Sequence, residues 1–276
     1  MPKEINNIDR EFMVIGLRRT GNHAIINWIL PQIQGDFLYY NDVWPNDPYK
    51  GNPKQFRGDG SSAKVSLISF EDYNLRIFKR IIKGRKHPIV KKRVSILILR
   101  DPFNWYASRL KSNMSNPAHY LGLNLRQLYL QYLREYQGDT NLLGDGLVTI
   151  SFNRWKSDLA YRQVISERLG LEFTDDGLNK VTGEGGGSSF DGMKIKGQEL
   201  NTETRYRHYL KNAKFLALFS NLEIINFSKR EFFVPSELQN ELSRNSKLSI
   251  KFLDNIVVRF VPRITTFLRS LYLKLR

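Results

Sequence analysis

Cysteine is absent from all 276 residues of the chain. Its absence excludes disulfide bonds, thiolate nucleophiles and cysteine-ligated zinc or iron–sulfur sites. Histidine is almost as scarce, and none of the 4 stands at the spacing of a metal-ligand pair: His23, His87, His119 and His208. The sequence therefore predicts no resident metal.

Long apolar runs are missing as well. No stretch of about 18 uncharged apolar residues occurs, so the sequence predicts no membrane-spanning helix. The first residues, MPKEINNIDREF, contain acidic side chains and no apolar core, unlike a secretory signal. Together with the lack of cysteine, these features favour a cytoplasmic location.

Acidic residues are few relative to basic ones. Against 43 Lys and Arg stand only 27 Asp and Glu, which gives a net charge of +16 and a pI near 9.9. Such a surface attracts anions: nucleic acid, phosphorylated or sulfated small molecules, acidic glycans or acidic lipids. The 41% of hydrophobic and 25% of charged residues are typical of a globular core and exclude wholesale disorder or a low-complexity scaffold.

Short apolar runs alternate with helical apolar spacing along the first two thirds of the chain. The predicted strands are 12–16, 37–40, 65–70, 94–99 and 147–152. The predicted helices are the segment after Gly21, 72–83, the segment after Pro102, 123–136 and 154–169. This alternation predicts an α/β fold, a three-layer sandwich with a central parallel sheet, and the β-branched run VSILIL is typical of a central strand.

Two stretches break this pattern. Residues 41–62 are rich in Asn, Asp, Pro and Gly and are too long for a plain connection, so we expect a loop on the substrate side. Residues 183–189, GEGGGSS, are typical of a mobile loop or of backbone that approaches a ligand closely.

The segment from Gly16 to His23, GLRRTGNH, lies between a predicted strand and a predicted helix. Glycines permit a tight turn there, and the N–H groups at the start of a helix bind anions. The G-x4-G spacing matches a nucleotide P-loop, but Asn22 follows where a Walker loop has Lys and then a hydroxyl that holds magnesium. Arg19 can supply the positive charge. The pattern also fits a plain turn with two solvated arginines.

A second element follows the strongest strand. Arg100 comes directly after VSILIL, and Ser108 lies eight residues later on the predicted helix that Asp101 caps and Pro102 begins. Ligands of open α/β sheets bind outside the carboxyl ends of the strands, where Arg100 is placed. Arg100 and Ser108 can hold a phosphate together, or they are a helix-capping pair and a surface serine.

These two elements together resemble the sulfotransferase family, whose fold is P-loop NTPase-like. FMVIGLRRTGNHAIINWIL resembles its strand–loop–helix for the 5′-phosphosulfate of 3′-phosphoadenosine 5′-phosphosulfate (PAPS), and VSILILRDPFNWYASRL resembles its site for the 3′-phosphate. VTISFNRWKSDLAYRQVISERLGLEF is similar to a later strand and helix, so the likeness covers roughly residues 11–175. The resemblance implies a metal-independent transfer of a sulfuryl group and these nucleotide-binding residues: Arg18, Arg19, Thr20, Gly21, Asn22, His23, Arg100 and Ser108.

The sequence departs from the family in two places. Ala24 stands where many cytosolic members have a tryptophan that stacks on adenine, and the family's C-terminal Arg-Lys-Gly signature is missing. Residues 183–192, GEGGGSSFDG, are the only candidate for closing over the nucleotide. The adenine contacts are therefore not predicted.

A base must take the proton of the acceptor, and Arg19 can stabilise charge on the leaving phosphate. Members of the family use a His or a Glu as the base. Asp42 stands at a spacing similar to that Glu and is our first choice, whereas Glu71 or Asp72 falls where the His lies in order. His23 lies in the loop itself and is a further candidate. Each carboxylate also fits a solvated loop charge.

The C-terminal residues 250–276 carry apolar side chains every three or four positions together with basic ones. We expect an α/β domain over 1–249 followed by this amphipathic helix, which docks on its own domain, forms a homodimer or binds an acidic membrane surface.

Other functions stay open at this stage. The acceptor is a carbohydrate or lipid hydroxyl, a small alcohol or phenol, or an amine. A P-loop kinase-like phosphotransferase lacks support because the loop has no Lys-Ser/Thr and no distinct metal-binding carboxylate follows a strand. A basic nucleic-acid-binding protein would explain the charge of +16, but its basic residues are spread along the chain without an RNA or DNA motif.

Overall fold

A six-stranded sheet forms the centre of the computed structural model, which describes residues 7–58, 63–85, 88–114, 123–180 and 200–244. Its strands are β1 (Asn7–Gly16), β2 (Phe37–Tyr40), β3 (Gln55–Arg57), β4 (Val65–Glu71), β5 (Ile89–Leu99) and β6 (Val148–Ser151). Their spatial order is β3-β2-β4-β1-β5-β6, and every neighbouring pair is parallel except β2 and β3. The predicted α/β class with a parallel sheet is confirmed.

Strand β3 is the part of the sheet that the sequence did not predict. It lies inside the stretch 41–62, which was expected to be loop throughout, and pairs antiparallel with β2 at the sheet edge. Three residues with mostly exposed side chains give no periodic signal.

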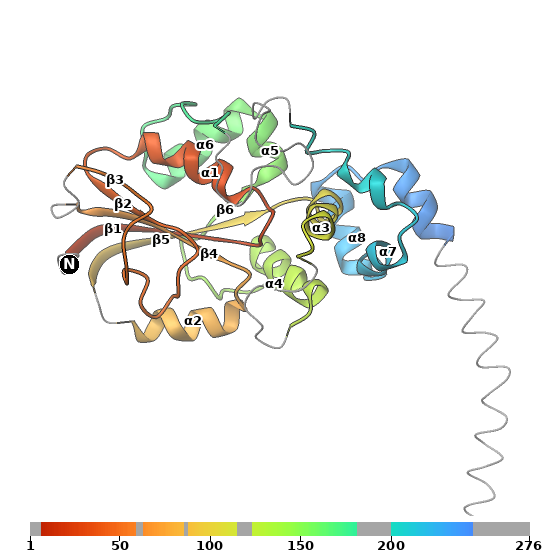
Figure 1. Cartoon of the computed structure of the whole chain (residues 1–276), viewed down its shortest axis with the longest axis horizontal. Helices are drawn as coiled ribbons and strands as arrows, with labels where there is room; N and C mark the ends of the chain where they lie inside the picture. Colours follow the sequence, from red (N-terminus) through yellow and green to blue (C-terminus); the bar gives the residue numbers. More distant parts are fainter. Residues whose placement is uncertain (1–6, 59–62, 86–87, 115–122, 181–199, 245–276) are drawn as a thin grey trace, which may run out of the picture. The chain divides into compact units, whose positions relative to one another are not determined.

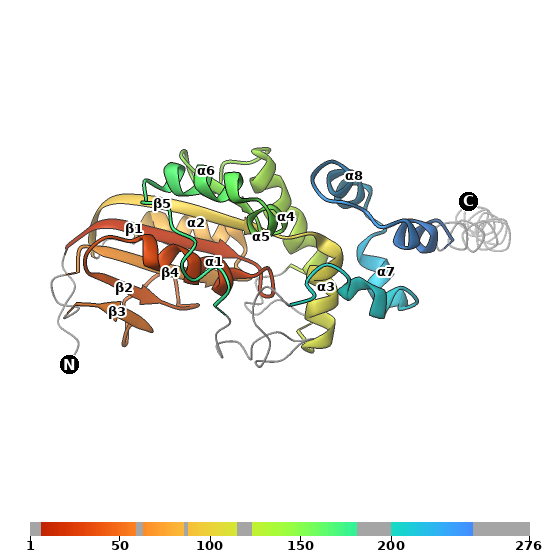
Figure 2. The ribbon, with the colours of Figure 1, turned by 90° about the horizontal axis from the view of Figure 1, so that it is seen from above.

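Helices cover both faces of the sheet, with α1, α5 and α6 on one face and α2 and α4 on the other (Figures 1 and 2). The bounds are α1 (Asn22–Ile29), α2 (Leu75–Gly84), α3 (Pro102–Lys111), α4 (Leu125–Gln137), α5 (Phe152–Ser157) and α6 (Leu159–Leu169). The single helix expected over 154–169 is wrong. Asp158 ends α5 there, and its carboxylate accepts a hydrogen bond from the Tyr161 N–H to cap α6.

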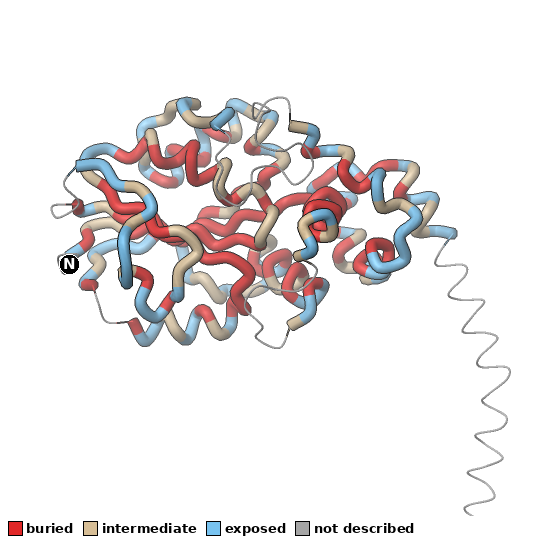
Figure 3. The backbone as a smooth tube through the Cα atoms, viewed as in Figure 1, coloured by how far each residue is buried: buried red, intermediate tan, exposed pale blue. Residues whose placement is uncertain are grey.

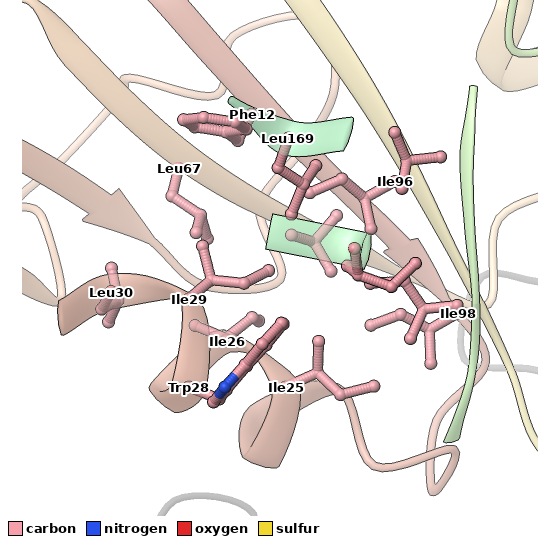
Figure 4. Packing of buried hydrophobic residues seen from close by; sticks show 14 of the residues in the cluster. Phe12, Ile25, Ile26, Trp28, Ile29, Leu30, Leu67, Ile96, Ile98 and Leu169 are labelled. Carbon is pink, nitrogen blue, oxygen red and sulfur yellow. The ribbon is translucent and has the colours of Figure 1, made fainter. Parts of the chain in front are cut away.

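Alternating side chains of the strands supply the core of each layer. Phe12 and Val14 of β1 and Ile96 and Ile98 of β5 face α1, α5 and α6 in one apolar cluster (Figure 4). On the opposite face, Phe70 of β4 packs edge-on against Phe78 of α2 with ring centroids 4.9 Å apart. The central strands are buried on both sides (Figure 3), as a continuous β-branched run predicts. Packing on both faces therefore fixes the carboxyl ends of the central strands, where the loops described below begin.

The chain divides into two compact units, residues 1–208 and 209–276. In the second unit the structure describes α7 (Ala213–Leu218) and α8 (Leu222–Glu231), each packed by an aromatic pair: Phe215 with Phe219 and Phe227 with Phe232. The helix predicted over 250–276, and with it the predicted division at 249, lies outside the described residues. The glycine-rich stretch 183–189 lies outside them too.

Candidate functional site

The turn between β1 and α1 is as tight as its two glycines allow. A Cβ on Gly16 would come within 2.0 Å of Asn22 Oδ1, and one on Gly21 within 2.2 Å of the Phe152 ring. Gly21 also has a φ of 94° and forms the N-cap of α1 without any side-chain cap in the described part of the chain. The N-terminus of α1 thus faces this turn with its positive dipole end, which is the arrangement of an anion-binding loop.

Buried polar groups hold the inside of this loop. Thr20 Oγ1 lies 2.7 Å from the Leu17 carbonyl oxygen and 2.8 Å from Asn22 Oδ1. Asn22 Nδ2 donates to the Leu17 carbonyl oxygen and to Glu71 Oε1, at 3.0 and 2.7 Å. The polar side chain after Gly21 therefore ties the loop to the end of β4 rather than pointing away from the protein.

Arg100 lies beside this loop at the carboxyl end of β5, as the sequence predicted for it. Only 2% exposed, its guanidinium donates to the carbonyl oxygens of Arg19 and Thr202 and lies 4.9 Å from the Phe152 ring centroid. Its Nε forms an ion pair with Asp101 Oδ2 at 3.7 Å but has no hydrogen-bond partner among the described residues. A buried N–H donor of this kind is costly unless an acceptor reaches it, so the site is suited to an anion.

Ser108 is completely buried on α3 and joins Arg100 in one cluster through a residue that the sequence analysis missed. Its hydroxyl donates to the Asn104 carbonyl oxygen at 2.8 Å and accepts from Arg205 Nη1 at 3.0 Å. Arg205, which is 6% exposed, opens the 3-10 helix Arg205–Tyr209. The only sequence signal for it was a pair of arginines shortly after the glycine-rich stretch.

The three arginines of this cluster repel one another. The pKa of Arg100 is lowered to about 10, mainly by burial and also by the charges of Arg205 and Arg19, while the charge of Asp101 opposes the shift. Burial also lowers the pKa of Arg19, and the charge of Arg205 adds to that effect. Guanidinium groups keep their charge at neutral pH, so the cluster concentrates positive charge in a low dielectric, which favours a bound anion.

Acidic groups gather on the other side of the loop, at the carboxyl ends of β2 and β4. Asp42 has a φ of 45°. Its Oδ2 forms an ion pair with Arg18 Nη2 at 2.6 Å, and its Oδ1 accepts a hydrogen bond from the Glu71 N–H. Glu71 is 8% exposed, and Arg18 Nε lies 3.6 Å from its Oε2. The neighbouring Asp72 forms an ion pair with Arg109.

Glu71 has the strongly shifted carboxyl of this group. Its pKa is raised to about 7, mainly by burial and also by the charges of Asp42 and Asp72, while the Asn22 hydrogen bond and the Arg18 charge oppose the shift. For Arg18, burial lowers the pKa, but Asp42, Glu71 and Asp72 outweigh burial and raise it. A carboxyl with a pKa close to neutrality is matched to the work of a general base.

The structure thus places the predicted residues in two groups at one edge of the sheet, because Gly16 is in register with Glu71 on β4 and with Ile98 on β5. Arg19, Arg100 and Ser108 belong to the cationic group, and Asp42, Glu71, Asp72 and Arg18 to the acidic group. The guanidinium of Arg18, which was predicted to bind nucleotide, forms ion pairs with Asp42 and Glu71 instead. His23 is half-buried in the first turn of α1. Their roles stay predictions.

Metal-binding clusters and membrane-spanning helices are both absent from the described residues. No group of three His, Cys, Asp or Glu in that part of the chain has the geometry to hold a metal ion. None of the helices there is long and apolar enough to cross a membrane.

The chain is structurally similar to sulfotransferases. Mouse sulfotransferase SULT7A1 complexed with PAP aligns with a TM-score of 0.39 and 11% identity over 62% of this chain, which spans 61% of the mouse chain. The sulfotransferase domain from the curacin biosynthetic pathway aligns with a TM-score of 0.40 and 11% identity over 88% of this chain and 99% of the domain. No family model matches the sequence, and no curated protein matches it.

Proposed function

We propose that this protein is a sulfotransferase that uses PAPS as the donor and a hydroxyl or amine as the acceptor. One observation carries the proposal: a cationic group and a carboxyl of raised pKa lie on the two sides of one anion-binding loop. Binding of a doubly anionic donor and removal of an acceptor proton need those two groups side by side.

The residues present fit a donor with two anionic ends. The loop Arg19–Gly21 and the N-terminus of α1 would hold the 5′ end, and Arg100, Ser108 and Arg205 the 3′-phosphate. The mutual repulsion of the buried arginines supports an anion there. Arg100 Nε has an ion-pair contact with Asp101 Oδ2 at 3.7 Å but no hydrogen-bond acceptor among the described residues, which supports it too. Arginine suits this role because its fork of N–H groups matches phosphate oxygens.

Glu71 is the base that the geometry favours. When bound, PAPS supplies the sulfuryl group and a phosphate that leaves with the electron pair of the broken bond. Glu71 takes the proton of the acceptor hydroxyl, and Asn22 and Arg18 fix its carboxylate oxygens in place. Asp42 is less suited, since both of its carboxylate oxygens are engaged, Oδ2 by Arg18 Nη2 at 2.6 Å and Oδ1 by the Glu71 N–H at 3.2 Å.

A kinase-like phosphotransferase fits these contacts poorly. The carboxylates that follow β4 and β5 are both occupied: Asp72 binds Arg109, and Asp101 caps α3 and accepts from Asn153. Neither presents oxygens for a nucleotide-bound magnesium in the way that a Walker-type carboxylate does.

Trp44 is the exposed aromatic residue nearest in sequence to the acidic group. It is 63% exposed and lies edge-on to Tyr73, whose hydroxyl donates to the Val43 carbonyl oxygen. The charge of Asp42 contributes to the raised pKa of Tyr73, second to burial, which places this aromatic pair close to the acids. An acceptor would approach Glu71 past Trp44, and its identity stays open among carbohydrates, lipids, alcohols, phenols and amines.

Calorimetric titration with 3′-phosphoadenosine 5′-phosphate in the absence of magnesium tests the donor site. We expect metal-independent binding at least about tenfold tighter than that of ADP or ATP, because the Arg100 cluster recognises a 3′-phosphate. A preference for magnesium-ATP would contradict the proposal and favour the phosphotransferase. Steeply salt-dependent binding of DNA with no nucleotide binding would favour the nucleic-acid-binding protein.

Asp42→Asn is expected to shift the pH dependence of turnover without abolishing turnover. The charge of Asp42 raises the pKa of Glu71, and without it Arg18 is left to pair with Glu71. The pKa of Glu71 therefore falls, and the acid limb of the kcat profile should move down by about one pH unit. A pH series of kcat measures the shift, and Asp47→Asn, an exposed carboxylate of the same loop, is the control. Loss of turnover at every pH with intact nucleotide binding would instead make Asp42 the base.

A further inference from the structure

Asp72 and Arg109 form an ion pair that is fully closed to solvent. Both side chains are 0% exposed, and two hydrogen bonds of 2.9 and 2.8 Å join the guanidinium to the two carboxylate oxygens. Asp72 follows β4 at a φ of 60°, a conformation that non-glycine residues seldom adopt. The pair links the end of β4 to α3, two elements that are 37 residues apart in the chain.

The same two residues hold the backbone of the anion-binding loop. Asp72 Oδ1 accepts a hydrogen bond from the Arg18 N–H at 2.9 Å, and the Asp72 N–H donates to the Gly16 carbonyl oxygen at 3.1 Å. Arg109 Nη1 donates to the Arg18 carbonyl oxygen at 3.3 Å, where Trp105 Nε1 also donates at 2.9 Å. Both backbone polar groups of Arg18 are therefore fixed by groups outside the loop.

Arg19, the next residue, is held in an unusual conformation between these contacts and Arg100. Its φ is 72°, and its carbonyl oxygen accepts from Arg100 Nη1. A non-glycine residue persists at such a φ only when its surroundings determine it, and here the surroundings are Arg18 on one side and Arg100 on the other. Burial of an ion pair contributes little to stability compared with apolar packing of the same volume, so stability alone does not account for the pair.

We propose that Asp72 and Arg109 are positioning residues for the anion-binding loop, which they keep in its anion-binding shape before any nucleotide arrives. The nucleotide then binds without having to order the loop, and affinity is higher because that cost is already met. The pair also helps to fix the position of Glu71, which precedes Asp72 in the sequence and accepts a hydrogen bond from Asn22 of the loop. The inference rests on the proposed function for its choice of ligand.

The test compares hydrogen exchange of residues 16–21 with affinity for 3′-phosphoadenosine 5′-phosphate in Asp72→Asn and in the double variant Asp72→Asn/Arg109→Gln. The double variant removes both charges, so no buried charge is left uncompensated if the single variant folds poorly. We expect exchange in this segment to rise about tenfold or more without nucleotide, and affinity to fall about 10- to 100-fold, while amides of the central strand β1 stay protected.

Asp175→Asn is the matched control. Asp175 also forms a two-bond ion pair, with Nε and Nη2 of Arg162 at 2.8 Å each, and its further hydrogen bond comes from Trp28 of α1 and not from residues 16–21. The Asp175→Asn variant should have a lower melting temperature than the wild type, with unchanged exchange at 16–21 and unchanged nucleotide affinity. Unchanged exchange at 16–21 in the folded double variant overturns the inference. If the wild-type protein binds no nucleotide, the proposed function fails, and the exchange comparison alone decides the role of the pair.

Discussion

Glu71→Gln is expected to lower kcat by about 10²- to 10⁴-fold while nucleotide affinity stays within about threefold of the wild type. Gln keeps the size and the hydrogen bond to Asn22, because its amide oxygen can accept as Oε1 does. It cannot take a proton from the acceptor. The first measurement is transfer of labelled sulfate from PAPS to a panel of alcohols, phenols and amines, followed by kcat for the best acceptor in both proteins.

The pH dependence gives a second, independent result for Glu71. Its pKa of about 7 means that the base is protonated and inactive below neutrality, so wild-type kcat should rise through pH 7 and level off above it. The native state binds more protons at this site than the unfolded chain does, whose carboxyl titrates near 4.5. The stabilisation that the protonated carboxyl gives the native state is therefore complete below about pH 4.5 and is lost as the pH rises to about 7.

Gln, which never ionises, does not lose this stability. The free energy of unfolding of Glu71→Gln should exceed that of the wild type above pH 7 by up to about 3 kcal/mol, and the two should converge below about pH 5. Denaturant unfolding at pH 5 and pH 8 measures the difference. Glu167→Gln on the exposed side of α6 is the control and should change neither quantity. An active Glu71→Gln protein with a pH-independent stability difference would exclude Glu71 as the base.

Local patterns in the sequence were enough to predict the frame of the site. The strand β5, the cap at Asp101 and the placement of Arg100 and Ser108 on one strand–helix connection all follow from residues within a few positions of one another. Gly16 and Gly21 likewise predicted a tight turn. In the structure a side chain at either position would clash, with Asn22 at position 16 and with Phe152 at position 21. Such features depend on short-range sterics and hydrogen bonds, which sequence spacing records.

The parts of the site that could not be predicted from the sequence depend on contacts between residues far apart in the chain. Arg205 reaches Ser108 across 97 residues of chain, and nothing in its own segment indicates a destination. The choice between Asp42 and Glu71 depends on which carboxylate Arg18 binds and which one is buried, and spacing reports neither. The Asp72–Arg109 pair joins two segments whose charges each look like ordinary surface residues in the sequence.

Arg100→Ala is the second large effect that we expect. Affinity for 3′-phosphoadenosine 5′-phosphate should fall by about 10²- to 10³-fold, since truncating one partner of a buried, charge-assisted contact costs about 2–5 kcal/mol. Affinity for adenosine 5′-phosphate, which lacks the 3′-phosphate, should fall much less. The preference for the 3′-phosphate is therefore the quantity to measure, by calorimetry with both nucleotides in wild type and variant.

Stability separates this expectation from simple damage to the fold. Removal of one of three mutually repelling arginines relieves repulsion in the free protein, although the carbonyl oxygens of Arg19 and Thr202 lose a donor. The two effects oppose each other, so the melting temperature without ligand should change little, whereas the rise that a fixed, high nucleotide concentration gives the wild type should become much smaller. Arg154→Ala, on the exposed side of α5, should leave both the rise and the 3′-phosphate preference intact. A variant at Arg100 that keeps that preference would show that the 3′-phosphate binds elsewhere, and the roles assigned to Ser108 and Arg205 would fall with it.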